Sequence, residues 1–286
     1  PRTTRRRTRQ TAAALFAALA LAAFALPAHA LRVVAWNLLN YDEVTAHARR
    51  ANTIIALAGL DPDVIVVQEL VTAGAADSFV ACLRAALPAK RWIGGSSTFI
   101  LSTQSALYYD SLQVAHSNLS SVVTGGPRAV LVSLIRPNGY RANAASFRIY
   151  SIHFKAGNGA GGASPPSDSS QRTLECTNLR NTLNIAPVGT NLLMGGDTNF
   201  YGSFETGYTR LTESQADNDG RLKDPYTMPG LWNSPSYAAF HTQSPCNGVC
   251  VGSGGGMDDR FDMLLGSYSL NDGLGLDLVP GALPGG

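Results

Sequence analysis

The chain has 286 residues, of which 45% are hydrophobic, so it is long enough to bury the core of one domain or at most two. Charged residues make up only 15%, against about a quarter in typical globular proteins, while glycine is plentiful at 29 residues. This balance fits an extracellular protein rich in loops and argues against a cytosolic helical protein.

The first thirty residues have the anatomy of a secretory signal peptide. Their positive region carries five arginines: Arg2, Arg5, Arg6, Arg7 and Arg9. An apolar run follows at 11–26, and Pro27 precedes the small-x-small sequence Ala28-His29-Ala30. The alternative, a transmembrane anchor, needs about 20 apolar residues, and this run is shorter. We therefore expect cleavage after Ala30, a secreted or periplasmic location, and one domain over 31–286.

Removal of this segment changes the sign of the net charge, which is +2 for the whole chain. Of the 22 basic residues 17 remain, against 20 acidic ones, which gives the mature chain a net charge of −3. Binding of a polyanion such as a nucleic acid would therefore rest on a local patch or a metal ion, and not on the overall field.

Four cysteines remain, an even number that favours disulfides in an oxidising compartment. Cys246 and Cys250 enclose a turn-forming Asn-Gly, so we expect them to form a local bridge. Cys82 would then pair with Cys176 by elimination, although the sequence does not fix this connectivity. A zinc site is the alternative, and companion His or Cys residues at ligand spacing are lacking for it.

Strand-like and helix-like segments alternate from residue 31 onward. Helical periodicity predicts helices at 46–60, 75–87 and 171–183. Apolar or β-branched runs predict strands at 31–36, 64–67, 99–109, 112–115, 130–135, 147–154, 191–194 and 261–265. Residues 156–170 and most of 201–256 have the composition of loops. The pattern predicts a mixed α/β domain with a sheet-rich middle.

Four of the predicted strands end on polar side chains, which together offer amides, carboxylates and an imidazole: Asn37, Glu69, His153, and Asp197 with Asn199. A buried strand delivers the side chains at its end to a rim, and α/β proteins build their sites on such rims. A strand-end Asn alone is more often a turn residue, and a strand-end Glu is more often solvated. Only the combination indicates chemistry.

This combination suits metal-assisted hydrolysis of a phosphoester. Glu69 and Asn37 offer hard oxygen ligands for Mg²⁺, with Mn²⁺ as the alternative cation. We expect Asp197 to orient or deprotonate an attacking water and Asn199 to hold that water or a phosphate oxygen. His153 is expected to donate a hydrogen bond to the phosphate.

Two cations are further candidates for contacts with the substrate phosphate. Lys155 follows the predicted strand of His153, and alternation places its side chain on the same side as the imidazole. An exposed strand-end Lys without a ligand is equally common. Arg128, which follows a Gly-Gly-Pro turn, is the weaker candidate of the two.

These motifs resemble those of the endonuclease/exonuclease/phosphatase family, which includes DNase-like enzymes, sphingomyelinases and inositol-phosphate phosphatases. Five segments over residues 31–265 carry the resemblance: Trp36-Asn37, Pro62-Asp63 leading to Gln68-Glu69, Ser151-Ile152-His153, Gly196-Asp197-Thr198-Asn199 and Asp259-Arg260-Phe261-Asp262. The resemblance implies a four-layer α/β/β/α sandwich of two packed mixed sheets flanked by helices. It also makes Asp262 a further catalytic acid.

The sequence departs from the family's pattern near its end. Members finish with a Ser-Asp-His motif whose His is central to catalysis, whereas the last histidine here is His241, which precedes Asp262. Because Asp272 is followed by Gly and the chain begins at Pro1, we interpret both ends as truncations, with the last strand of the domain missing. The alternative is a genuine loss of the motif.

The leading hypothesis is therefore an exported, nuclease-like phosphodiesterase that uses a Mg²⁺-assisted water. One alternative is a sphingomyelinase-like enzyme or another phosphoester phosphatase, and a second is a catalytically silent phosphate-binding module. The substrate would be a nucleic acid or a phospholipid headgroup. The sequence implies no stable protein partner, and we expect a monomer.

Overall fold

The computed structural model describes residues 30–158, 167–244, 246 and 256–279. The chain divides into two compact units, Pro1–Leu31 and Arg32–Gly286. The expected signal peptide lies outside the described residues except for Ala30, and so does Cys250, the expected partner of Cys246. Within the described ranges, no helix combines the length and apolar character needed to cross a bilayer.

One sheet is built from the N-terminal half of the second unit. Its strands are β1 (Val33–Tyr41), β2 (Val64–Leu70), β3 (Trp92–Ile93), β4 (Phe99–Ile100) and β5 (Ser105–Asp110). They run in the order β1-β2-β5-β3, with β4 also paired to β5. The β1–β2 pair is parallel and the pairs with β5 are antiparallel, so the sheet is mixed.

The second sheet has six strands. They are β6 (Val114–Val122), β7 (Val130–Pro137), β8 (Phe147–His153), β9 (Asn191–Asp197), β10 (Leu222–Lys223) and β11 (Asp262–Ser267). Their order is β10-β11-β9-β8-β7-β6, and β8–β9 is the one parallel pair among them. The parallel register sets His153 beside Asp197, and the antiparallel register of β11 sets Asp262 on the other side of Asp197.

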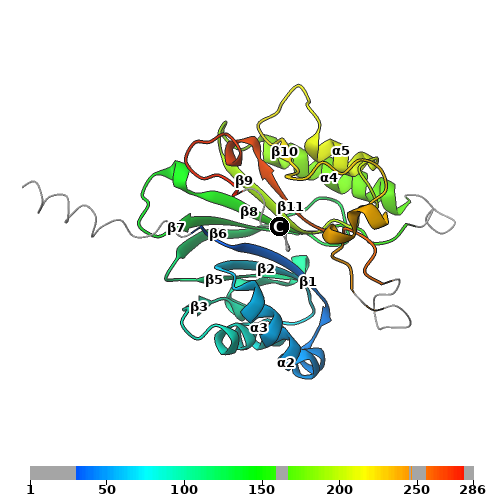
Figure 1. The fold of residues 1–286 in the computed structure, drawn as a ribbon. Coiled ribbons are helices and arrows are strands. Elements are labelled where there is room, and N and C mark those ends of the chain that lie inside the picture. Colours follow the sequence, from blue (N-terminus) through cyan, green and yellow to red (C-terminus); the bar gives the residue numbers. More distant parts are fainter. Residues whose placement is uncertain (1–29, 159–166, 245, 247–255, 280–286) are drawn as a thin grey trace, which may run out of the picture. The chain divides into compact units, whose positions relative to one another are not determined.

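Helices cover the outer face of each sheet, so the second unit has four layers in the order α/β/β/α (Figure 1). Helices α2 (Glu43–Leu60) and α3 (Ala73–Ala86) pack on the five-stranded sheet, and α4 (Asp168–Asn184) and α5 (Thr206–Thr212) cover the six-stranded one. Side chains cap the longer helices, since Asp42, Thr72 and Ser167 each accept a bond from a backbone N–H three residues on. The predicted sandwich is confirmed.

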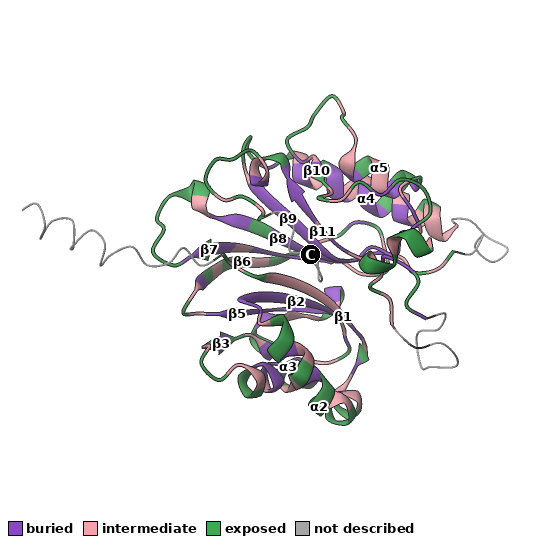
Figure 2. Ribbon diagram, viewed as in Figure 1, coloured by how far each residue is buried: buried purple, intermediate pink, exposed green. Residues whose placement is uncertain are grey.

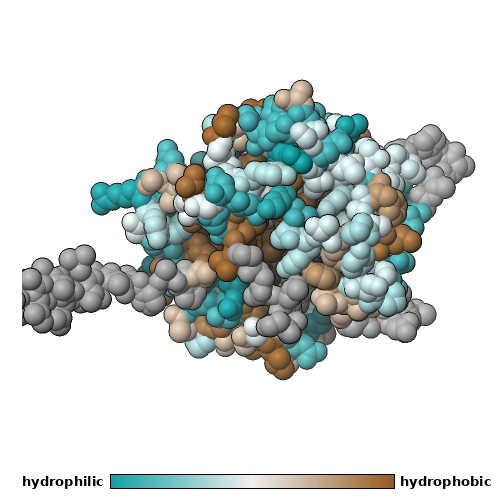
Figure 3. All heavy atoms as spheres, turned by 45° about the horizontal axis from the view of Figure 1, so that its top comes forward, coloured by the Kyte–Doolittle hydropathy of each residue, from teal (hydrophilic) through white to brown (hydrophobic). Residues whose placement is uncertain are grey.

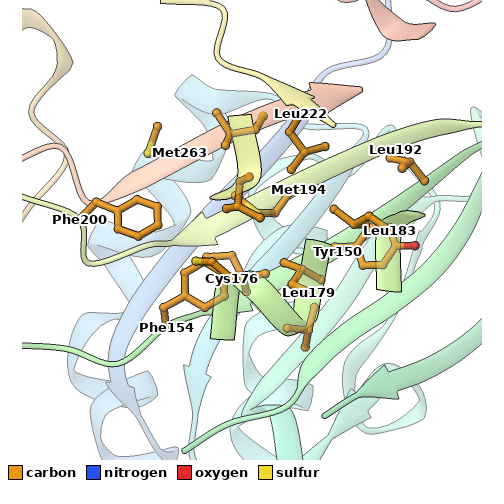
Figure 4. Close-up of a cluster of buried hydrophobic side chains, with 14 of the residues drawn as sticks. Tyr150, Phe154, Cys176, Leu179, Leu183, Leu192, Met194, Phe200, Leu222 and Met263 are labelled. Atoms are coloured by element: carbon orange, nitrogen blue, oxygen red, sulfur yellow. The ribbon is translucent and has the colours of Figure 1, made fainter. Parts of the chain in front are cut away.

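Each sheet packs against its helices through a separate hydrophobic cluster. The cluster of the six-stranded sheet joins strand residues such as Tyr150 and Met194 to Cys176 and Leu179 of α4 (Figure 4). The cluster of the five-stranded sheet contains Cys82 of α3. Cys82 and Cys176 are both buried and free. The pairing of these two cysteines, which the sequence left open, is not formed, because the two side chains belong to different cores on different sheets.

The inner faces of the two sheets pack against each other. Ile149 and Leu193 alternate with the residues that face the helices, and both are buried. Gly195 lets the sheets approach closely, because a Cβ there would lie 3.2 Å from the Cβ of Ala35 on β1. Across the same interface Gln68 Nε2 donates to Ser151 Oγ at 2.8 Å. This bond ties the ends of β2 and β8 together beneath the site.

Buried residues concentrate along the strands and on the inward faces of the helices (Figure 2). The outer face drawn in Figure 3 mixes hydrophilic and hydrophobic residues, with the hydrophobic ones in separate patches. Such an interspersed surface is normal for a globular domain.

Two segments differ from their predicted structure. The strand predicted at 99–109 is interrupted by a 3-10 turn at Leu101–Thr103, followed by Gln104 with a positive φ of 49°. The stretch expected to be mostly loop contains α5, β10 and a 3-10 helix at Pro235–Phe240. Three further 3-10 turns lie at Gly95–Thr98, Asn143–Ala145 and Tyr268–Leu270. Of these short elements, α5 packs against α4, and β10 pairs with β11; such tertiary contacts are not encoded in local periodicity.

Candidate active site

Five strands bring their polar ends to one edge of the sandwich. The parallel pairs β1–β2 and β8–β9 end at this edge, and the antiparallel β11 begins there. The residues delivered are those expected from the sequence: Asn37, Glu69, His153, Asp197 and Asp262. Together with Asn199 they line one cavity of about 590 Å³.

Asn37 connects the two sheets at the centre of this site. Its Nδ2 donates to Glu69 Oε1 and to Asp197 Oδ2, each at 2.8 Å, while its Oδ1 accepts from the N–H of Leu39 at 2.9 Å. One amide thereby holds a carboxylate from each sheet. The expectation that Asn37 is itself a metal ligand stays a prediction. In the structure its side chain bridges Glu69 and Asp197.

Glu69 sits in an uncommon backbone conformation. Its φ is +60°, in the left-handed region that β-strand residues avoid. Such strain is tolerated where surrounding contacts fix the residue, and it concentrates at functional sites. Both carboxylate oxygens of Glu69 are fixed, Oε1 by Asn37 and Oε2 by the N–H of Asn40 at 2.7 Å.

His153 is buried and neutral. Burial, followed by the nearby charge of Arg128, lowers the pKa of the imidazole to about 3. The Nη2 of Arg128 lies 2.7 Å from His153 Nε2, so Nε2 accepts this bond and Nδ1 carries the proton. The Nδ1 atom is buried with no hydrogen-bond partner among the described residues. The expected donation from His153 to a phosphate stays a prediction; here the imidazole accepts from Arg128.

Two buried carboxyl groups lie side by side next to His153. Burial raises the pKa of Asp197 to about 6, against the effect of its hydrogen bonds from Asn37 and from the N–H of Asn199. Burial, followed by the charge of Asp197, raises the pKa of Asp262 to about 8. Asp262 Oδ1 has no partner among the described residues. The site therefore holds a buried carboxyl oxygen that no donor among the described residues satisfies.

This donor set fits a divalent cation. Glu69, Asp197 and His153 each present one ligand atom, and these atoms lie within 4.8 Å of one another. The imidazole Nε2 is 3.7 Å from Glu69 Oε1 and 3.8 Å from Asp197 Oδ2. Two carboxylate oxygens are the type of ligand that hard cations such as Mg²⁺ or Mn²⁺ prefer. The clustered carboxylates thus have the chemistry of a metal site, with His153 held by Arg128.

Two further predicted residues, Asn199 and Lys155, differ in their relation to the cavity. Asn199 lies in the cavity with a positive φ of 53°, and its Nδ2 donates to Phe154 O at 3.2 Å. The Nζ of Lys155 pairs with Asp168 Oδ1 at 2.7 Å and donates to Ala156 O at 2.6 Å, and the side chain is 40% exposed. A role for Lys155 in phosphate binding stays a prediction, and it would require this ion pair to break.

Several residues near the site had no signal in the sequence. Arg49 of α2 and Thr242 line the cavity. The fully buried Glu175 of α4 accepts from the N–H of Lys155 at 3.0 Å, just beyond His153. Burial raises its pKa to about 7. Helix periodicity could have placed Arg49 and Glu175 on α2 and α4, but not the loops that they contact.

Structures of known proteins resemble this chain over most of its length. A humanised TDP2 of D. rerio matches with a TM-score of 0.51 at 16% identity, covering 83% of each chain. An endonuclease/exonuclease/phosphatase family protein of Bacteroides thetaiotaomicron matches with a TM-score of 0.52 at 14% identity, again covering 83% of each chain. A β-hairpin deletion mutant of beta toxin from Staphylococcus aureus matches with a TM-score of 0.51 at 12% identity, covering 84% of this chain and 88% of the toxin.

The chain has the endonuclease/exonuclease/phosphatase fold. No protein-family model matches the sequence, and no curated protein matches it. The low sequence identities mean that the likeness concerns architecture. What the domain does has to be argued from the site.

Proposed function

We propose that this protein is a metal-dependent phosphodiesterase of the endonuclease/exonuclease/phosphatase family. The observation that carries the proposal is the position of Asn37, which joins Glu69 and Asp197 at 2.8 Å each. Two acids from separate sheets are thereby held together at the mouth of a cavity. Acids placed so close repel each other, and a bound cation relieves that repulsion.

The residues of the chain divide the work of hydrolysis among them. Mg²⁺ or Mn²⁺, when bound, would stabilise the charge that develops on the phosphoryl oxygens. Glu69 would hold the cation. Asp197, with a pKa of about 6, is a stronger base than an exposed carboxylate and accepts the proton of the attacking water. Asn199 positions that water, and Arg128 adds positive charge beside the phosphate.

Asp262 complements Asp197 in this arrangement. Its pKa of about 8 means that it carries a proton near neutral pH in the absence of a cation. Because a protonated Asp262 is neutral, it adds no second negative charge beside Asp197. Its O–H also offers a hydrogen-bond donor at the wall of the cavity. This role makes Asp262 part of the catalytic machinery.

A nucleic acid is the first substrate that we propose. A TDP2 of D. rerio that has this fold, with a TM-score of 0.52 at 17% identity, was crystallised with a single-stranded DNA product. The net charge of −3 expected for 31–286 means that binding would depend on local cations such as Arg128. Export through the signal peptide is part of the proposal, and scavenging of nucleic acids outside the cell is a use consistent with it.

A phospholipid headgroup is the second candidate substrate. The cavity has apolar walls beside the acids, made in part by Trp36, Leu39 and Met257. Met257 is also 52% exposed, so an apolar residue is available at the rim. These walls suit a lipid ester as well as a nucleobase.

A substrate panel tests the proposal. Hydrolysis of single-stranded DNA, duplex DNA, RNA, sphingomyelin and a simple phosphomonoester is measured with Mg²⁺ and with EDTA. We expect EDTA-sensitive cleavage of a phosphodiester, with single-stranded DNA cleaved fastest. EDTA-sensitive cleavage of sphingomyelin alone would select the second candidate. If Mg²⁺ binds and no substrate is cleaved, the proposed activity is wrong and the catalytically silent phosphate-binding module becomes the favoured alternative.

A further inference from the structure

The segment that follows Asn37 has a strained backbone. Leu39 and Asn40 both have positive φ values, 53° and 48°. The β1–β2 register shifts between Asn37 and Tyr41 because of this segment. Left-handed conformations at non-glycine residues are unfavourable and persist only where other contacts impose them.

Arg49 of α2 provides such contacts. Its Nη1 donates to Leu38 O and its Nη2 donates to Leu39 O, both at 2.6 Å. The planar guanidinium thus holds two successive carbonyl groups of the strained segment with charge-assisted bonds. The guanidinium carbon also lies 5.9 Å from the centre of the ring of Tyr41, the residue that follows the segment in the sequence.

The strained segment in turn orients the carboxylate of Glu69. The N–H of Asn40 donates to Glu69 Oε2 at 2.7 Å, and Asn37 Nδ2 donates to Oε1 at 2.8 Å. The amide of Asn37 is itself oriented by the N–H of Leu39, which donates to its Oδ1 at 2.9 Å. Among the described residues, the hydrogen bonds to the two carboxylate oxygens of Glu69 therefore come from residues 37–40.

We propose that Arg49 is a positioning residue that sets the affinity of Glu69 for a divalent cation. The inference rests on the part of the proposed function that places a cation at Glu69. Arg49 fixes the carbonyls of Leu38 and Leu39, this segment presents the N–H of Asn40, and that donor fixes the carboxylate. Loss of groups that orient a metal ligand typically weakens metal binding by about 10- to 100-fold.

Charge and geometry make opposite predictions for Arg49. Its positive charge interacts with Glu69, so by charge alone its removal would strengthen the binding of a cation at Glu69. The positioning role requires the reverse, because a mobile segment would leave Glu69 without its fixed donors. The direction of the change in affinity therefore separates the two roles.

Arg50 provides a matched control on the same helix. It is the next residue of α2 and is exposed, and its Nη1 lies 3.8 Å from Cys82 Sγ of α3. It carries the same charge as Arg49, yet its side chain contacts Cys82 of α3, whereas the side chain of Arg49 bonds to residues 37–40. Arg50→Ala therefore removes a cation from α2 without releasing the segment.

The experiment is a calorimetric titration with Mn²⁺ alone on four proteins: the wild type, Arg49→Ala, Arg49→Lys and Arg50→Ala. We expect affinity about 10-fold weaker for Arg49→Ala, intermediate for Arg49→Lys, which lacks the planar fork, and unchanged for Arg50→Ala. Hydrogen exchange at the Asn40 amide should also accelerate in Arg49→Ala and not in Arg50→Ala. Circular dichroism verifies that each variant is folded.

Several results would overturn the inference. One is an Arg49→Ala variant that is folded and binds Mn²⁺ as tightly as the wild type, or more tightly. Equal losses in Arg49→Ala and Arg50→Ala, or no Mn²⁺ binding by the wild type, would do so as well. Because no substrate is present, the titration is independent of turnover. A wild type that binds Mn²⁺ without cleaving any phosphoester would disprove the proposed activity and leave this inference standing.

Discussion

The guanidinium of Arg128 donates a hydrogen bond from Nη2 to His153 Nε2 across 2.7 Å. This bond sets the tautomer of the imidazole and places a positive charge beside the acids of the site. The same charge interacts favourably with Glu69 and Asp197. Among the predicted site residues, Arg128 had the least support from the sequence. It is in direct contact with His153, which had strong support.

Replacement of Arg128 should impair hydrolysis more than binding of the cation. We expect Arg128→Ala to lower kcat by about 10²- to 10³-fold, the usual cost of losing one donor to a developing negative charge. Arg128→Lys should recover only part of this loss, because an ammonium lacks the guanidinium fork. Arg136→Ala, at an exposed position on β7, is the control and should leave kcat unchanged.

The same variant should change the titration of His153. Since the charge of Arg128 lowers the pKa of this imidazole, its removal should raise the pKa, which burial still keeps below the ordinary value. An NMR titration of His153 in Arg128→Ala measures the change. A His153 pKa that stays near 3 in this variant would show that Arg128 has no electrostatic effect on it.

Glu69→Gln should abolish the response of the protein to divalent cations while leaving the fold intact. A cation that binds only the folded state raises Tm, so Mg²⁺ should stabilise the wild type and have no effect on Glu69→Gln. Metal-dependent hydrolysis should be lost in parallel. Glu213→Gln, at an exposed surface ion pair with Arg210, is the control. Full activity in Glu69→Gln would disprove the role of this carboxylate.

The stability of the metal-free protein should fall as the pH rises from 5 to 8.5. The pKa of Asp262 is raised to about 8 and that of Asp197 to about 6. The unfolded chain has already lost both protons at pH 5, whereas the folded protein loses that of Asp197 near pH 6 and that of Asp262 near pH 8, so stability decreases as the pH rises through these values. The decrease should be smaller in Asp262→Asn, which cannot ionise.

Added Mg²⁺ supplies the contrasting measurement. A cation favours the ionised carboxylates, so it should flatten the fall in Tm between pH 6 and 8.5. Thermal melts of the wild type and Asp262→Asn, with EDTA and with Mg²⁺, provide the comparison. A wild-type Tm in EDTA that is constant over this range would contradict the raised pKa values.

Arg172→Ala should destabilise the fold. Arg172 is fully buried on α4; its Nε and Nη2 bond to Glu205 at 2.8 and 2.9 Å, and its Nη1 bonds to the carbonyls of Lys155 and Gly157. Removal leaves the buried Glu205 uncompensated, at a cost of about 3–5 kcal/mol. Chemical denaturation measures the loss. Arg210→Ala, which breaks the exposed pair with Glu213, should cost less than about 1 kcal/mol.

The strand ends could be predicted because their signals are local. Val64–Val67 is an unbroken β-branched run, and such a run forms a buried strand whose next polar residues, Gln68 and Glu69, must lie at its end. The same reasoning placed His153 and Asp197. The predicted helices were found, with ends shifted by a few residues where caps such as Asp42 and Ser167 set them. Among the strands, the one predicted at 99–109 is interrupted, and the one predicted at 112–115 extends to Val122.

Other expectations failed or stay open because they concern contacts between residues that are far apart in the sequence. The Cys82–Cys176 pairing followed from the sequence only by elimination and was left open, and the two thiols lie in separate cores. Alternation placed Lys155 beside His153, yet β8 ends at His153 and the Lys155 side chain turns to Asp168. Asp262 was assigned by resemblance, and its place next to Asp197 follows from the pairing of β11 with β9.

The sequence by itself determined which residues end the central strands, and hence the site around Glu69, His153 and Asp197. Tertiary structure decided the charge states and contacts of those residues. A pKa depends on burial and on neighbours that are distant in sequence, such as Arg128 for His153. The bond from Asn37 to Asp197 spans 160 residues, and no local pattern encodes it. Only the packing of two sheets brings those two side chains together.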